Sequence, residues 1–148
     1  MQYLVAVDGS EPSTEALEHA LEVAAQMDAS LTVGYAVEPR VLVEDSGEEA
    51  PTHAQVGDRI YTENIEVAEE RGQDVLDDAR DRASDVGIDI ETTLLYGDPV
   101  ESIVEYAEQS EIDGVIVGHR GLSERVEMVG SVAKGLVEKA TVPVTVVK

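Results

Sequence analysis

Residues 3–12 have the sequence Tyr-Leu-Val-Ala-Val-Asp-Gly-Ser-Glu-Pro, an apolar run that ends in a polar turn. A short apolar run bounded by such a turn is typical of a strand buried on both faces of a parallel sheet. Ser10 suits the N-cap of a following helix, and Pro12 suits its first turn. The stretch therefore predicts a strand followed directly by a helix, which is the repeating unit of an α/β protein.

The same alternation of strand and helix patterns continues along the chain. Helical spacing of apolar residues recurs between short apolar runs, which predict strands at 31–37, 88–95, 114–118 and 142–147. Asp98 as a cap, Pro99 at the first helical position and Glu101 three residues after the cap predict another helix start. The pattern indicates one α/β domain over residues 1–148, with a parallel sheet, helices on both faces and right-handed crossovers.

One connection is much longer than the others. Residues 38–60 show no regular apolar period, and a loop of this length is uncommon inside a compact domain, so we expect it to be functional or mobile. A long amphipathic helix is predicted to follow, with acidic residues on one face and an apolar face made of Ile60, Val67, Val75, Leu76, Ala79, Ala83 and Val86.

The composition restricts the partners and the compartment. The net charge is −22, from 32 acidic and ten basic residues, and this charge should repel nucleic acid and anionic lipid. So acidic a chain with so few lysines is expected in a salt-rich host, where screening weakens self-repulsion. No apolar run approaches the roughly 20 residues that span a bilayer, the first residues do not resemble a signal peptide, and cysteine is absent. We expect a cytoplasmic protein.

A candidate phosphate site follows the strand at 114–118. That strand runs into Gly118-His119-Arg120-Gly121, and Gly130-Ser131 follows after eight intervening residues, at the start of a helix. Glycines let the backbone approach a ligand closely, and a helix N-terminus favours a phosphate group. The basic residues also gather here, at Arg120, Arg125, Lys134 and Lys139. The alternative is a set of structural turns with incidental arginines.

Three segments together resemble the universal stress protein family. They are Val5-Ala-Val-Asp-Gly-Ser10, the Gly118-x-x-Gly121 and Gly130-Ser131 pair, and Val142-Pro-Val-Thr-Val-Val147. The likeness covers the whole chain in the same order, including the long loop. It implies a doubly wound, five-stranded parallel sheet of order 3-2-1-4-5 and a homodimer.

The resemblance also implies a ligand, ATP with Mg²⁺ or Mn²⁺. Asp8 matches the position that contacts ribose and helps to hold the metal, Ala36 matches the adenine pocket, and the glycine segment wraps the phosphates. The candidate binding residues are Ala6, Asp8, Ala36, Val117, Gly118, His119, Arg120, Gly121, Gly130, Ser131 and Val132.

Three functions are consistent with these residues. The first is a stress-associated regulatory protein that binds ATP, with slow or no hydrolysis because no base, lysine or arginine is committed to the transition state. The second is a nucleotide-free dimeric module that meets protein partners. The spacing between Gly121 and Gly130, one residue shorter than the family pattern, favours that alternative. The third is a slow ATPase or phosphotransferase that uses Asp8 and Ser131.

The C-terminal strand is the expected dimer contact. Val144–Val147 is apolar and should lie at an edge of the sheet, where unpaired backbone groups can receive another strand. The alternative is that the long loop or a helix covers this edge within one chain.

Overall fold

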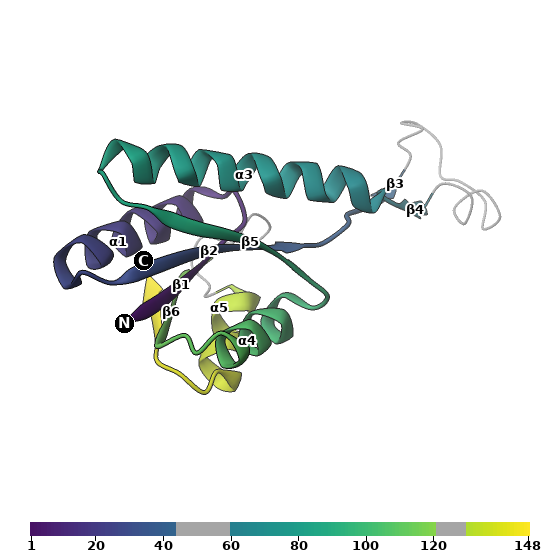
Figure 1. Ribbon diagram of the computed structural model, residues 1–148. Coiled ribbons are helices and arrows are strands. Elements are labelled where there is room, and N and C mark those ends of the chain that lie inside the picture. The colour runs from purple at the N-terminus through teal and green to yellow at the C-terminus, as the bar shows by residue number, and fades with distance from the viewer. Residues whose placement is uncertain (44–59, 121–129) are drawn as a thin grey trace.

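The protein is a single parallel sheet between two layers of helices (Figure 1). The structure, a computed structural model, describes residues 1–43, 60–120 and 130–148. All pairs in the sheet are parallel and follow the order β5-β2-β1-β6-β7. The strands are β1 (Gln2–Val7), β2 (Ser30–Val37), β5 (Ile90–Tyr96), β6 (Gly114–Gly118) and β7 (Val144–Val147). The predicted order 3-2-1-4-5 is confirmed.

Helices cover both faces of the sheet, as predicted. Figure 1 shows α1 (Glu11–Met27) and α3 (Ile65–Asp85) on one face, and α4 (Pro99–Gln109) and α5 (Ser131–Lys139) on the other. Each pair of helices buries its own core, one around Leu76 and the other around Leu136. Within the described ranges, no helix is both long and apolar enough to cross a membrane.

The predicted helix starts are confirmed by their capping bonds. The Ser10 hydroxyl accepts a hydrogen bond from the Ser13 N–H at 3.3 Å, and the Asp98 carboxylate accepts one from the Glu101 N–H at 3.0 Å. Gly9 has a φ of +86°, which glycine adopts readily, and it turns the chain from β1 into α1.

The segment 38–60 is not irregular throughout. Its two ends form an antiparallel hairpin of β3 (Val41–Val43) and β4 (Ile60–Thr62), while residues 44–59 lie outside the described residues. Ile60 therefore belongs to a strand, and the prediction that it begins the long helix is wrong. The helix starts at Ile65 because Asn64 caps it, accepting from the Glu66 N–H at 2.8 Å.

The buried face of α3 is predicted correctly in part: Leu76, Ala79 and Ala83 are buried, and Val75 packs against the same core. Val67 and Val86 are 48% and 61% exposed. Ala68 and Gly72, which the prediction did not include, complete the buried face. Small side chains at these positions allow a close approach of helix and sheet.

β7 lies at one edge of the sheet, as expected, and β5 lies at the other. β7 begins at Val144, later than predicted, directly after Pro143, which has no N–H to give to a ladder.

Candidate functional site

A cleft of about 850 Å³ opens at the carboxyl ends of β1, β2 and β6. This is where ligands bind in open parallel sheets, next to the point where the strand order reverses. A smaller cavity of about 240 Å³ lies between α1 and α3 and shares Val7 and Ser13 with the cleft. The larger cleft is the candidate site because the sequence-predicted residues gather there.

All but two of the predicted site residues line this cleft: Ala6, Asp8, Ala36, Val117, Gly118, Arg120, Gly130, Ser131 and Val132. Gly121 lies outside the described residues. His119 is not among the lining residues, since its ring lies against β7, with Nδ1 3.3 Å from the carbonyl oxygen of Val147. That any of these residues touches a ligand stays a prediction.

The floor of the cleft is apolar. Ala6, Ala36 and Val117 come from three strands, and alternation along each strand turns them towards the face that α4 and α5 cover. Ile103 of α4 and Val132 of α5 complete this surface. Alanines at two of the strand positions leave space above the sheet, so the floor can take a flat apolar group.

Asp8 stands at the middle of the cleft with one oxygen already engaged. Its Oδ1 accepts from the Ser10 N–H at 2.9 Å and from the Ser10 hydroxyl at 2.5 Å. The Asp8 N–H donates to the Ser13 hydroxyl at 3.2 Å, so backbone and side chain are both held. The described residues make no hydrogen bond to Oδ2, which leaves this oxygen for a ligand or a cation.

The N-terminus of α5 opens into the same cleft. Ser131, Val132 and Ala133 are its first three residues, and all line the cleft. The cap position is Gly130, which offers no side-chain hydrogen bond. The N–H groups of Val132 and Ala133 are the ones that a capping side chain would normally engage. Together with the helix dipole, these groups give the helix start the features that favour an anion.

Gly118 has a steric role different from the one predicted. A Cβ there would lie 2.7 Å from the carbonyl oxygen of Pro12 and 3.2 Å from the backbone nitrogen of Ser13. The glycine therefore allows the first turn of α1 to pack on the end of β6. Close approach to a ligand is not needed to explain it.

The match to known proteins covers the full length of the chain. Residues 1–148 match the model of the Universal stress protein family. The chain belongs to the universal stress protein family. A universal stress protein of Methanocaldococcus jannaschii is 32% identical over 147 residues, covering 98% of this chain and 80% of that relative. YxiE of Bacillus subtilis is 29% identical over 146 residues, covering 98% and 97% of the two chains.

Solved structures of the family share the fold of this universal stress protein. UspA from Lactobacillus plantarum superposes with a TM-score of 0.77 at 24% identity, over 100% of this chain and 97% of that one. A universal stress protein in complex with cAMP gives 0.69 at 27% identity, over 100% and 97%. A family member from Arabidopsis thaliana with AMP bound gives 0.67 at 20% identity, over 100% and 91%.

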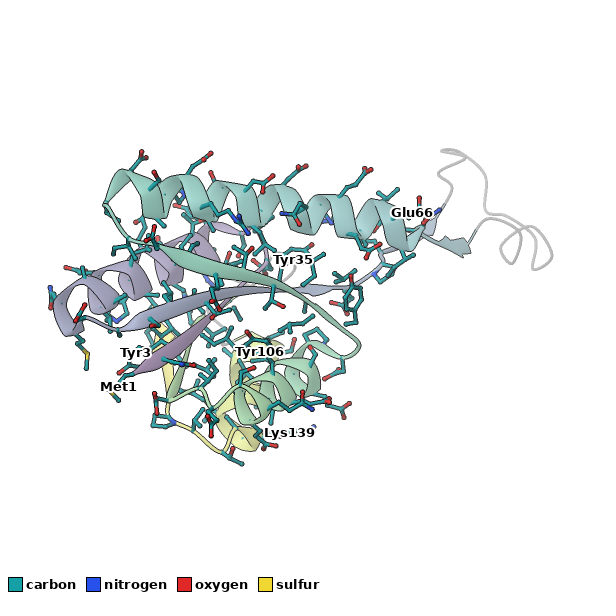
Figure 2. All side chains as sticks on the ribbon, viewed as in Figure 1. Met1, Tyr3, Tyr35, Glu66, Tyr106 and Lys139 are labelled. Carbon is teal, nitrogen blue, oxygen red and sulfur yellow. The ribbon has the colours of Figure 1, made fainter. Side chains whose placement is uncertain are left out.

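Sequence reasoning missed the side of the cleft next to the hairpin. In this universal stress protein Tyr35, Glu38, Pro39, Arg40 and Arg71 line that side. Figure 2 shows Tyr35 between α3 and the sheet. The available signal was the position of Arg71 between Ala68 and Gly72, at the border of the buried face of α3.

The shortest ion pair of the described residues lies on this side of the cleft. The Arg71 guanidinium donates to both oxygens of Glu63, at 2.6 Å and 3.0 Å. This bond, with a further bond from the Arg40 N–H, lowers the pKa of Glu63 to about 2. Hydrogen bonding to Glu63, and secondarily to Tyr35, raises the pKa of Arg71 above its ordinary value.

Proposed function

We propose that this universal stress protein is a regulatory protein that binds ATP with a divalent cation in the cleft between β1 and β6, with slow or no hydrolysis. The observation that carries the proposal is the N-terminus of α5, where the cap residue Gly130 gives no side-chain hydrogen bond and the Val132 and Ala133 N–H groups open into the same cleft as the Asp8 carboxylate. A phosphate chain and its cation need these two elements side by side.

The contrast among the helices supports a phosphate at α5. The helices α1, α3 and α4 each begin with a side-chain cap and an acidic residue in the first turn. α5 has neither, and it carries Lys139 in its last turn. An acidic residue in the first turn of α5 would repel an anion, so this helix start suits a phosphate group and the other three do not.

The cation would be held by Asp8 and the phosphates together. Within residues 1–43, 60–120 and 130–148, no group of three or more His, Asp or Glu side chains could hold a metal ion alone. Mg²⁺ is commonly bound by one or two carboxylates plus phosphate oxygens, and Oδ2 of Asp8 can supply one such ligand. Asp8 lies where it can orient the phosphates and the cation. This role favours binding over rapid hydrolysis.

The related structures support the binding of a nucleotide but do not decide which nucleotide binds. One related structure holds cAMP and another holds AMP. The apolar floor of Ala6, Ala36 and Val117 suits a base in each case. The length of the phosphate chain separates these ligands, so ATP, AMP and cAMP have to be compared directly.

The proposal includes a homodimer through β7. The Val115 and His119 N–H groups donate to the carbonyls of Pro143 and Val147. Pro143 and Val147 therefore turn their backbone carbonyl groups towards β6. Val144 and Val146 then turn theirs outward, where the strand of a second copy can pair. A nucleotide-free module built on this dimer is the second candidate, favoured by the short Gly121–Gly130 spacing.

A salt-rich host is the remaining part of the proposal. The ion pairs within the described residues join Arg71 to Glu63 and Arg82 to Glu18 and Asp78, which leaves most of the 32 acidic residues without a salt bridge there. Their repulsion weakens as salt screens it. Thermal stability that rises with KCl concentration supports this view, and stability independent of KCl contradicts it.

Calorimetric titration in KCl with Mg-ATP, AMP and cAMP tests the function. We expect micromolar binding of Mg-ATP to the wild type and at least a tenfold loss in Asp8→Asn. The matched control is Asp113→Asn, since the Asp113 carboxylate also accepts a backbone bond, from Gln2 at 2.7 Å, at the opposite end of β1. Equal binding of Mg-ATP by the two variants, or no binding by the wild type, contradicts the proposal.

A further inference from the structure

The helices α1 and α3 enclose a cavity that the proposed nucleotide does not occupy. Its volume is about 240 Å³, and its apolar walls are Val7, Leu17, Val75 and Ala79. Pockets for drug-sized ligands measure roughly 300–1,000 Å³, so this cavity suits a smaller molecule. The walls come from both helices, and such a molecule would therefore lie in the groove between them.

The polar side of the cavity offers hydrogen-bond acceptors from both helices. Thr14 of α1 and Asp74 of α3 line it. The Thr14 hydroxyl donates to the Ser10 carbonyl at 3.2 Å, so its oxygen can still accept a hydrogen bond. Asp74 is exposed, and it has no ion pair or hydrogen bond with any residue that the structure describes. The cavity therefore lacks a donor.

The next turn of the same two helices shows which group fits such a position. The helices run side by side in the same direction (Figure 1). Asp78 follows Asp74 by one turn of α3, and Glu18 follows Thr14 by one turn of α1. There the guanidinium of Arg82 bridges the helices, with Nε 2.8 Å from Asp78 and NH1 3.1 Å from Glu18. A cation with an alkyl stem thus joins α1 and α3 one turn beyond the cavity.

The chain supplies no equivalent cation at Asp74 within the described ranges. The nearest arginine on α3 is Arg71, three residues earlier, and it donates NH1 and NH2 to Glu63. No basic side chain lines the cavity in that part of the chain. Asp74 and Asp78 are also like charges four residues apart on one helix, which repel each other. A cation from outside the chain would relieve this repulsion.

We infer that the cavity binds a short alkyl chain that ends in a cationic group, with the chain against the apolar walls and the cation between Asp74 and Thr14. The inference does not depend on the nucleotide site. An alkylammonium group has donors only, which match the carboxylate and the hydroxyl, and its methylene groups gain from burial in the cavity. A free aliphatic amine and a lysine side chain of another protein both present this chemistry.

A nitrogen–proton NMR titration with n-butylammonium, methylammonium and n-butanol tests the site. We expect n-butylammonium to shift the amide signals of Gly9, Thr14 and Val75 in a saturable way, with a dissociation constant on the order of millimolar. The Val132 and Ala133 signals in the nucleotide cleft should stay fixed. Methylammonium lacks the chain and n-butanol lacks the charge, so each should bind at least tenfold more weakly.

A further probe separates the two sources of the alkylammonium group. Nα-acetyl-lysine methylamide carries the same group on a peptide backbone. Affinity equal to that of n-butylammonium indicates a lysine side chain of a partner protein. Binding of n-butylammonium alone indicates a free amine, because the backbone then prevents entry into the cavity.

Asp74→Asn is the decisive variant, and we expect about a tenfold loss of affinity for n-butylammonium. The matched control is Asp77→Asn, which makes the same change of charge on the same helix. Asp77 accepts from Gln73 at 3.1 Å and does not line the cavity, so this variant should match the wild type. Equal affinities of the two variants would mean general attraction to an acidic surface and would overturn the inference. It is also overturned if n-butylammonium causes no saturable shift, or if methylammonium binds as tightly.

Discussion

His119 is bonded to Val147 of the edge strand, and its ring is not part of the cleft lining. Its backbone N–H donates to the Val147 carbonyl at 3.0 Å, and its Nδ1 lies 3.3 Å from the same oxygen. Its own carbonyl accepts from the Gly130 N–H at 2.5 Å. One residue thus links the start of α5 to the C-terminal strand, so the cleft and the proposed dimer edge are neighbours in the fold.

The first prediction concerns the His119 ring. His119→Ala removes one side-chain hydrogen bond and keeps both backbone bonds, so we expect a loss of about 1 kcal/mol in the free energy of unfolding. ATP affinity should stay within about twofold of the wild type, because the ring is outside the cleft lining. Denaturant unfolding and calorimetry measure the two quantities. A large loss of affinity with unchanged stability would place the ring in the site.

Gly118→Ala is expected to destabilise the fold by about 1–3 kcal/mol through overpacking. The added Cβ would meet backbone atoms of Pro12 and Ser13, which cannot move without shifting α1. Gly34→Ala is the matched control, because its Cβ would meet only side-chain atoms, the nearest at 3.3 Å on Leu4. Denaturant unfolding of both variants should show the smaller loss in Gly34→Ala, and the reverse order contradicts the packing described for Gly118.

The Glu63–Arg71 pair predicts a dependence of stability on pH. The pKa of Glu63 falls from 4.5 to about 2 on folding, so its charged form stabilises the fold above pH 4.5. That contribution is lost as pH falls from 4.5 through 2. The stability difference between wild type and Glu63→Gln should therefore be constant near neutral pH and shrink in this range. A difference that stays constant down to pH 2 means that the pair does not form.

The dimer edge gives the fourth prediction. Val146→Pro removes an N–H that faces outward from β7 and should convert the proposed homodimer to a monomer in sedimentation analysis. Val146→Ala also removes apolar contact but keeps the N–H, so it is the control and should remain dimeric. A dimeric Val146→Pro variant would require a different interface.

The elements predicted correctly from sequence depend on local signals. Ser10 and Asp98 form caps with bonds to residues three positions away, and these bonds follow from sequence spacing alone. The buried strands follow from their apolar runs. The cleft residues on β1, β6 and α5 could be named because they sit at strand ends and at one helix start, where the topology brings them together.

The remaining features depend on contacts that no spacing encodes. The hairpin of β3 and β4 pairs strands separated by residues 44–59, and each strand, at three residues, is too short to show a period. Arg71 and Arg80 are both arginines on α3, but only the former has a glutamate from the hairpin against it. The exposure of Val67 likewise follows from the small residues that face the sheet.

The most direct test of the central claim is a nitrogen–proton NMR titration of the labelled protein with Mg-ATP. If the phosphates bind at the start of α5, the amide signals of Val132 and Ala133 should shift in a saturable way, and adenosine alone should not move them. Signals at the other helix starts, such as that of Glu101, should stay fixed because Asp98 already caps them. Unchanged Val132 and Ala133 signals at saturating Mg-ATP would contradict the account.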